Sequence, residues 1–169
     1  MEFWYWESVV YSIVVWMAVF VFLDIERIKA LWPIGLLSSV LLLTSHFFLS
    51  SLGSAHFNEG FLTLAGVPLF HLFWSFGAGL LLIGFMPREF IKKILTLLLF
   101  TILALALDML SVRVGGHVHD NFTFLHSFVF ILYRLVTLVW IAEELLGEKM
   151  YAKGNRKETD YRLRNLLKL

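Results

Sequence analysis

The sequence contains no cysteine among its 169 residues, and charged residues make up only 16% of it. The absence of cysteine excludes disulfides, thiolate metal ligands and cysteine nucleophiles. Hydrophobic residues reach 59% and the mean hydropathy is +0.79, which lies outside the usual balance of a soluble domain. The basic residues form no stripe that could follow phosphates, so we expect no nucleic-acid partner. The composition indicates an integral membrane protein.

Two catalytic motifs are also missing. The chain has neither His-Glu-x-x-His nor Gly-x-Ser-x-Gly, which excludes the helical zinc-protease arrangement and the nucleophile elbow of hydrolases. Its serines are interpreted as hydrogen-bonding groups between helices. No internal repeat of the kind found in secondary transporters is visible. The residues therefore favour a non-enzymatic role.

Five apolar runs are long enough to cross a bilayer, which requires about 20 residues in a helix. We predict an all-α fold with a five-helix transmembrane bundle over 1–146 and a basic tail over 147–169. No lysine or arginine precedes the first run, so we expect no cleavable signal peptide. The predicted spans are Trp4–Leu23, Leu31–Leu52, Phe61–Phe85, Ile91–Val112 and Phe122–Leu145.

Basic residues concentrate in alternate connections between these runs. The connections after the first and third runs carry them, as does the tail, whereas the other two connections contain only Arg113. Under the positive-inside rule, this pattern places the amino terminus outside and the tail in the cytoplasm of a multi-pass plasma-membrane protein. The basic residues of the two connections are Arg27, Lys29, Arg88, Lys92 and Lys93.

With this orientation, all six histidines fall on the outer side, as do Asp108 and Asp120. Polar groups inside hydrocarbon are costly, so they usually face the bundle interior, find partners and mark functional sites. We therefore predict an outward-facing polar pocket. Its expected members are His46, His71, Asp108, His126 and Arg134.

Further predictions concern Arg134 and the third predicted span. Arg134 lies near the predicted midplane, and its long side chain can reach outward to Asp108, which predicts an ion pair. Pro68 lies inside the predicted third span, where it is expected to kink the helix beside His71 or merely to shape packing. Later in that span, Gly77, Gly79 and Gly84 predict close approach of a neighbouring helix.

The histidines also allow a metal site. His117-Val-His119-Asp120 presents two imidazoles and a carboxylate in one short connection, and zinc or another borderline divalent ion accepts such ligands. The predicted ligands are His71, His117, His119 and His126, with His46 converging on them. Two alternatives stay open: solvated histidines within a hydrogen-bonded network, and a proton path built from the same groups. No other cofactor is predicted.

The tail is expected to contact the inner membrane surface, because basic residues near anionic headgroups each contribute about 1 kcal/mol. Leu163, Leu166 and Leu167 share one helical face and predict a short amphipathic helix there. The residues expected to contact anionic lipids are Lys149, Lys153, Arg156 and Lys157.

Three features of the sequence match the arrangement of a known protein family. They are the Arg27-Ile28-Lys29-Ala30-Leu31-Trp32 opening of the second run, Phe85-Met86-Pro87 after the third, and an acid late in the fourth. In these the chain resembles an uncharacterised family of small five-helix integral membrane proteins from spore-forming Gram-positive bacteria. Asp108 stands where that family leads us to expect glutamate. The family has no established reaction, so the resemblance implies fold and location only.

Together these observations predict a structural or accessory membrane protein with an outward polar pocket. It could be a subunit of a membrane assembly with a membrane-protein partner, or a homo-oligomer. The alternative is a ligand, metal or proton site that supports transport or membrane-embedded enzymatic activity.

Overall fold

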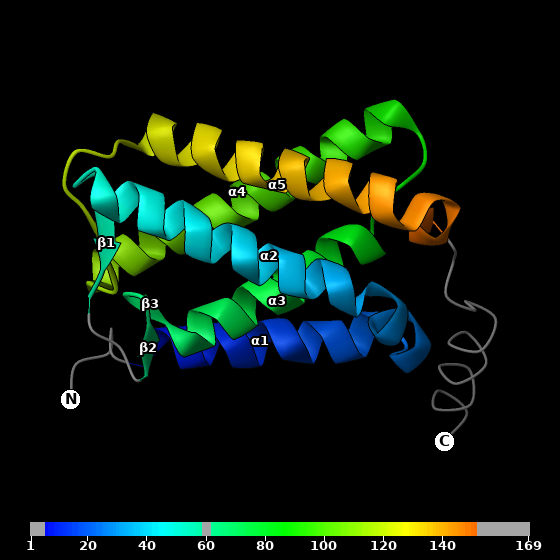
Figure 1. Cartoon of the computed structure of the whole chain (residues 1–169), viewed down its shortest axis with the longest axis horizontal. Coiled ribbons are helices and arrows are strands. Elements are labelled where there is room, and N and C mark those ends of the chain that lie inside the picture. The colour runs from blue at the N-terminus through cyan, green and yellow to red at the C-terminus, as the bar shows by residue number, and fades with distance from the viewer. Residues whose placement is uncertain (1–5, 59–61, 152–169) are drawn as a thin grey trace, which may run out of the picture.

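The computed structural model describes residues 6–58 and 62–151, which form five α-helices lying side by side with alternating direction (Figure 1). Three of the helices are long and apolar enough to cross a membrane, which agrees with the composition. The other two, α1 and α3, are apolar but only 16 residues long. The helices are α1 (Glu7–Phe22), α2 (Ile25–Ser51), α3 (Leu69–Gly84), α4 (Phe90–Val114) and α5 (Phe124–Leu146).

Two of the helix starts that differ from the prediction are set by side-chain caps. Helix α2 begins at Ile25, six residues before the predicted Leu31, because the Asp24 side chain accepts a hydrogen bond from the Arg27 amide at 2.6 Å and caps the helix. Helix α5 begins after Thr123, whose hydroxyl accepts from the His126 amide while His126 accepts from the Thr123 amide. These caps fix where each helix starts.

The prediction that Pro68 lies inside the third helix was wrong, so Pro68 does not kink that helix. Residues 63–68 form a β-hairpin of β2 (Thr63–Leu64) and β3 (Val67–Pro68), and α3 starts only at Leu69. Ala65 and Gly66, at the hairpin turn, both have positive φ, which is the backbone pattern of a tight two-residue hairpin turn. Pro68 is the residue before the helix and has an extended conformation, so it marks a boundary.

Helix α3 lies at the centre of the packing, against α1 and α2. Leu80, Leu82 and Ile83 are fully buried. A Cβ added at Gly79 would lie 2.6 Å from Ser38 Cβ, and one at Gly77 would lie 2.7 Å from Val15 Cγ1. The predicted close approach at the small residues of α3 is therefore confirmed.

Serines join the same helices. Ser38 donates to the Ser75 carbonyl oxygen at 2.8 Å, and Ser39 donates to the Leu72 carbonyl oxygen at 2.8 Å. These bonds link α2 to α3 in the bundle interior, as the sequence predicts for serines between apolar helices.

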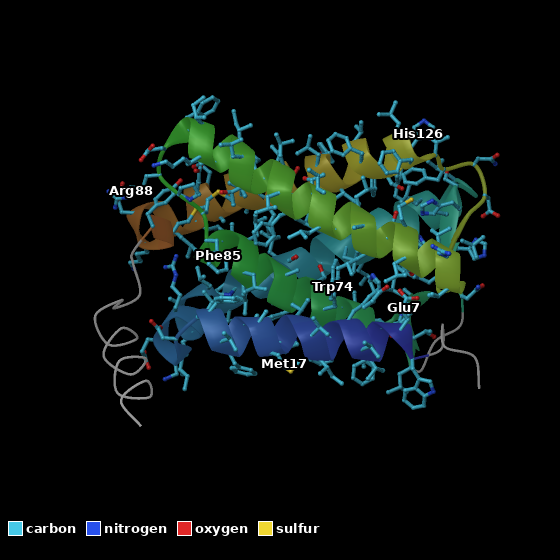
Figure 2. The ribbon with its side chains drawn as sticks, turned by 180° about the vertical axis from the view of Figure 1, so that it is seen from behind. Glu7, Met17, Trp74, Phe85, Arg88 and His126 are labelled. Atoms are coloured by element: carbon cyan, nitrogen blue, oxygen red, sulfur yellow. The ribbon has the colours of Figure 1, made fainter. Side chains whose placement is uncertain are left out.

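Large apolar side chains cover the outside of the bundle. Helix α4 exposes Leu95, Leu99 and Ile102, and α1 exposes Phe20. Met17 projects outward from α1 (Figure 2). A continuous apolar exterior of this kind suits contact with lipid.

At the end of the bundle that carries the basic residues, the segment after α5 packs back on the helices. A short 3-10 helix, η2 (Gly147–Tyr151), follows α5, and Met150 is fully buried. Arg27 donates to the carbonyl oxygens of Lys149, at 2.8 Å, and Met150. The first residues of the predicted tail therefore pack on the bundle. The other predicted lipid-contacting residues, Lys153, Arg156 and Lys157, and the predicted amphipathic helix lie outside the described residues.

Candidate functional site

All six histidines lie at the opposite end of the bundle, where α2 and α4 finish and α3 and α5 begin. Figure 2 shows Glu7 and His126 at this end and Arg88 at the other. The two connections here pair as an antiparallel ladder of β1 (Ala55–Phe57) and β4 (His117–His119). Alternate residues of a strand face opposite sides, so His117 and His119 share one face. The spacing His-Val-His therefore turns both imidazoles the same way.

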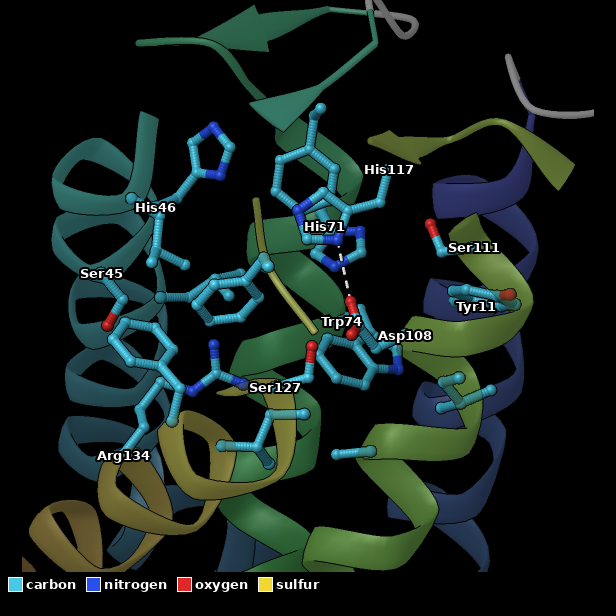
Figure 3. A pocket seen from close by; sticks show the side chains of 18 residues that line it. Tyr11, Ser45, His46, His71, Trp74, Asp108, Ser111, His117, Ser127 and Arg134 are labelled. Carbon is cyan, nitrogen blue, oxygen red and sulfur yellow. Dashed lines mark hydrogen bonds and ion pairs between the residues drawn. The ribbon is translucent and has the colours of Figure 1, made fainter. Parts of the chain in front are cut away.

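That face meets Asp108, in the last part of α4. His117 Nδ1 lies 2.8 Å from Asp108 Oδ1 (Figure 3), and His119 Nε2 lies 3.5 Å from Asp108 Oδ2. One ligand atom from each of the three residues lies within 4.8 Å of the others. Adjacent ligand atoms around a tetrahedral zinc ion with bonds of about 2.0–2.1 Å are about 3.3 Å apart. The Asp108–His117–His119 cluster therefore needs little movement to coordinate an ion.

The cluster contains buried polar atoms that the protein does not satisfy. Among the described residues, His117 Nε2 and His119 Nε2 are buried and have no hydrogen-bond partner. Burial lowers the pKa of His119, although the neighbouring Asp108 carboxylate opposes this shift. A neutral imidazole carries the lone pair that a metal ion requires. Buried polar groups left unpaired in this way call for an explanation, and an ion is one.

His46 and His71 lie beside this cluster, separated by an aromatic ring. The Phe57 ring centroid lies 4.6 Å from that of His46 and 4.5 Å from that of His71. The His46 and His117 centroids are 6.4 Å apart. His46 and His71 therefore line the cavity next to the cluster, and His71 is not a member of the group whose ligand atoms converge.

The other two histidines have different positions. His126 is exposed and caps α5, so the predicted role as a metal ligand is not supported by its geometry. His56, on the far face of the ladder, has its Nδ1 3.0 Å from Asp120 Oδ2, and both side chains are nearly half exposed. Asp120, which the sequence places next to His119, thus pairs away from the cluster, and Asp108 takes its place.

Arg134 and Asp108 line the same cavity, but the expected ion pair between them is not formed. Among the described residues, the ion pairs of Asp108 are with His117 and His119. The Arg134 head group extends from α5 into the cavity below them (Figure 3).

Glu7 is a residue of this end that the sequence analysis missed. It is 2% exposed, and neither carboxylate oxygen makes a hydrogen bond within the described chain, although the hydroxyls of Tyr11 and Ser111 are close. A Cβ added at Gly116 would lie 1.8 Å from Glu7 Oε2. A small second cavity, lined by Glu7, His71 and Ser111, adjoins the first. An acid inside an otherwise apolar run was the available signal.

Comparison with family models, curated proteins and solved structures found no match to this chain. The site is therefore interpreted from its own geometry.

Proposed function

We propose that this chain is a multi-pass plasma-membrane protein that binds a divalent transition metal ion at its outward-facing, histidine-rich end. The ligands are Asp108, His117 and His119. The observation that carries the proposal is the convergence of their ligand atoms within 4.8 Å, together with the buried Nε2 atoms of His117 and His119, which make no hydrogen bond to the described residues. The ladder between β1 and β4 holds two of the ligands in place before any ion arrives.

Zinc fits this ligand set best. Imidazole nitrogen and carboxylate oxygen are ordinary zinc ligands, and the site offers no thiolate that would favour softer ions. Three protein ligands leave one tetrahedral position open, which is the pattern of zinc sites that bind an exogenous ligand. The contact between His117 Nδ1 and Asp108 Oδ1, at 2.8 Å, already holds these two ligands side by side.

The distribution of basic residues supports the outward orientation. Arg27, Arg88 and Lys93 lie at the end opposite to the metal cluster, where Arg88 pairs with Glu148 at 2.6 Å and Lys93 with Glu143. The positive-inside rule assigns that end to the cytoplasm. The metal cluster would then lie near the outer surface, where it can exchange ions with the surroundings of the cell.

We further propose an accessory role, as a metal-binding subunit or partner of a membrane assembly. Ser38, Ser39 and Ser75 support this role because they are engaged in bonds between helices. Ser111 and Ser127, in contrast, line the cavity, and their hydroxyls have no hydrogen-bond partner among the described residues. Transport or membrane-embedded catalysis remains the competing proposal. A substrate-dependent loss of activity in Asp108→Asn protein of normal yield would favour that proposal.

The test is zinc binding by the purified, detergent-solubilised full chain. We expect one zinc ion per chain by elemental analysis, and titration calorimetry should show at least about a hundredfold weaker binding in Asp108→Asn and in the His117→Ala/His119→Ala double variant. His126→Ala and His56→Ala are the matched controls and should bind like the original protein. Unchanged affinity in the double variant would overturn the proposed ligands.

A further inference from the structure

The cavity beside the metal cluster holds a cation deep in the bundle. Arg134 is ten residues into α5 from Phe124, which corresponds to about 15 Å along the helix axis. Within the described chain, its guanidinium makes no hydrogen bond or ion pair, and the acidic residue that lines the same cavity is Asp108. An arginine kept at this depth without a partner requires a compensating group.

The charges of the cavity become unbalanced when a metal ion binds. Asp108 and Arg134 are the two charged residues that line it, and their charges cancel. A divalent ion then adds two positive charges in surroundings of low polarity. Glu7, in the adjoining cavity, offsets one of them at most. An anion inside the cavity would remove the remaining cost.

We propose that the cavity binds an organic oxyanion, a carboxylate or a phosphate, whose head group occupies the open metal position and faces Arg134. This inference rests on the metal site proposed above. Guanidinium groups match the planar geometry of carboxylates and the oxygens of phosphates, and they bind both with paired hydrogen bonds. The ligand oxygen completes the coordination of the ion, and the arginine supplies the second contact.

The cavity walls support an anion with an apolar body. Leu42, Phe130 and Ile131 line the cavity together with Trp74. Trp74 is 7% exposed, and its Nε1 donor is buried without a partner in the described part of the protein. A buried N–H donor is a second group that an oxyanion would satisfy. Such an anion comes either from a lipid or fatty acid of the outer leaflet or from a small carboxylate or phosphate in water.

The experiment uses the full chain in detergent with cobalt(II) in place of zinc, because the visible absorption of cobalt responds to its ligands. Acetate and inorganic phosphate test the water-soluble source, and decanoate and dioctanoyl phosphatidic acid test the lipid source. We expect a saturable spectral change with one of the two groups. The anion concentration that gives half of this spectral change should rise about tenfold or more in Arg134→Gln, since a charge-assisted hydrogen bond is lost.

Two variants keep the test decisive. Arg134→Lys retains the charge but not the paired donors, so it should show an intermediate loss. Arg113→Gln removes an exposed arginine near the end of α4 and should behave like the original chain. If Arg134→Gln does not fold, the titration of the original chain and of Arg134→Lys still decides.

The outcomes separate the two proposals. Absence of any cobalt spectrum in the original chain would overturn the metal site and this inference with it. A cobalt spectrum that no anion alters, or one altered equally in the original and Arg134→Gln proteins, would overturn the oxyanion site alone and leave the metal site standing.

Discussion

Phe57 and His117 stack across the β1–β4 ladder, with ring centroids 4.5 Å apart and planes inclined by 20°. The two residues are direct partners in the register, so the backbone pairing enforces the stacking. Phe57 also contacts His46 and His71, which makes it the ring around which the imidazoles of the cavity are arranged. The orientation of His117 towards Asp108 therefore depends on an apolar side chain.

Replacing this ring should weaken the metal site without removing a ligand. Phe57→Ala is expected to lower stability by about 2 kcal/mol, because the half-buried ring is lost, and to weaken zinc binding about tenfold. Phe57→Leu, which keeps apolar contact, should show the smaller effect on both. Thermal unfolding and calorimetric titration measure the two quantities. Equal zinc affinity in Phe57→Ala would show that Phe57 does not position His117.

Gly116 should tolerate no side chain while Glu7 is present. Gly116→Ala places a methyl group 1.8 Å from Glu7 Oε2, so the buried carboxylate or the start of β4 must move, at a cost of about 1–3 kcal/mol. Glu7→Ala removes the obstruction. The Gly116→Ala/Glu7→Ala double variant should therefore lose less than the sum of the single losses, by the melting temperature in detergent. Additive losses would contradict the contact.

Arg27 should matter far more to stability than Lys29, although both belong to the first basic connection. Arg27 is 8% exposed and bonds to two carbonyl oxygens of η2, whereas Lys29 forms an exposed pair with Glu26 at 3.0 Å. We expect Arg27→Ala to cost about 2 kcal/mol and Lys29→Ala less than about 0.5 kcal/mol. Faster amide exchange at Met150 in the first variant only would locate the effect.

The orientation can be tested with single cysteines, because the chain has none of its own. Asn121→Cys lies at the histidine-rich end and Glu148→Cys at the basic end, and both positions are exposed. An impermeant thiol reagent should label position 121 in intact cells and position 148 only after lysis. The opposite pattern would place the metal cluster in the cytoplasm.

The parts of the fold that follow from local sequence were predictable. Apolar runs locate helices, and the spacing of polar residues located the layer that contains His46, Asp108 and Arg134. Contacts that depend on tertiary geometry were not predictable. The sequence suggested Arg134 as the partner of Asp108, whereas the pairing of two connections far apart in the chain brings His117 to it.

The β2–β3 hairpin before α3 is a second feature that could not be predicted from the sequence. A continuous apolar run from Phe61 onward fits a buried strand or a helix equally well. The deciding feature is a turn that contains Ala65 at positive φ, a conformation rare for alanine and therefore not signalled by the residue itself. Pro68 therefore precedes the helix and does not kink it. The sequence alone could not distinguish the two roles, because proline occurs both at helix boundaries and at helix kinks.

Because Ala55 pairs with His119 and Phe57 with His117, the direction of both imidazoles depends on the number of residues between α4 and β4. Inserting one residue after Gly116 would turn both imidazoles from the bundle interior to the exterior, whereas inserting two would restore their direction. The proposed metal binding at this end would thus depend on an odd or even number of residues in this connection as much as on the identity of the histidines.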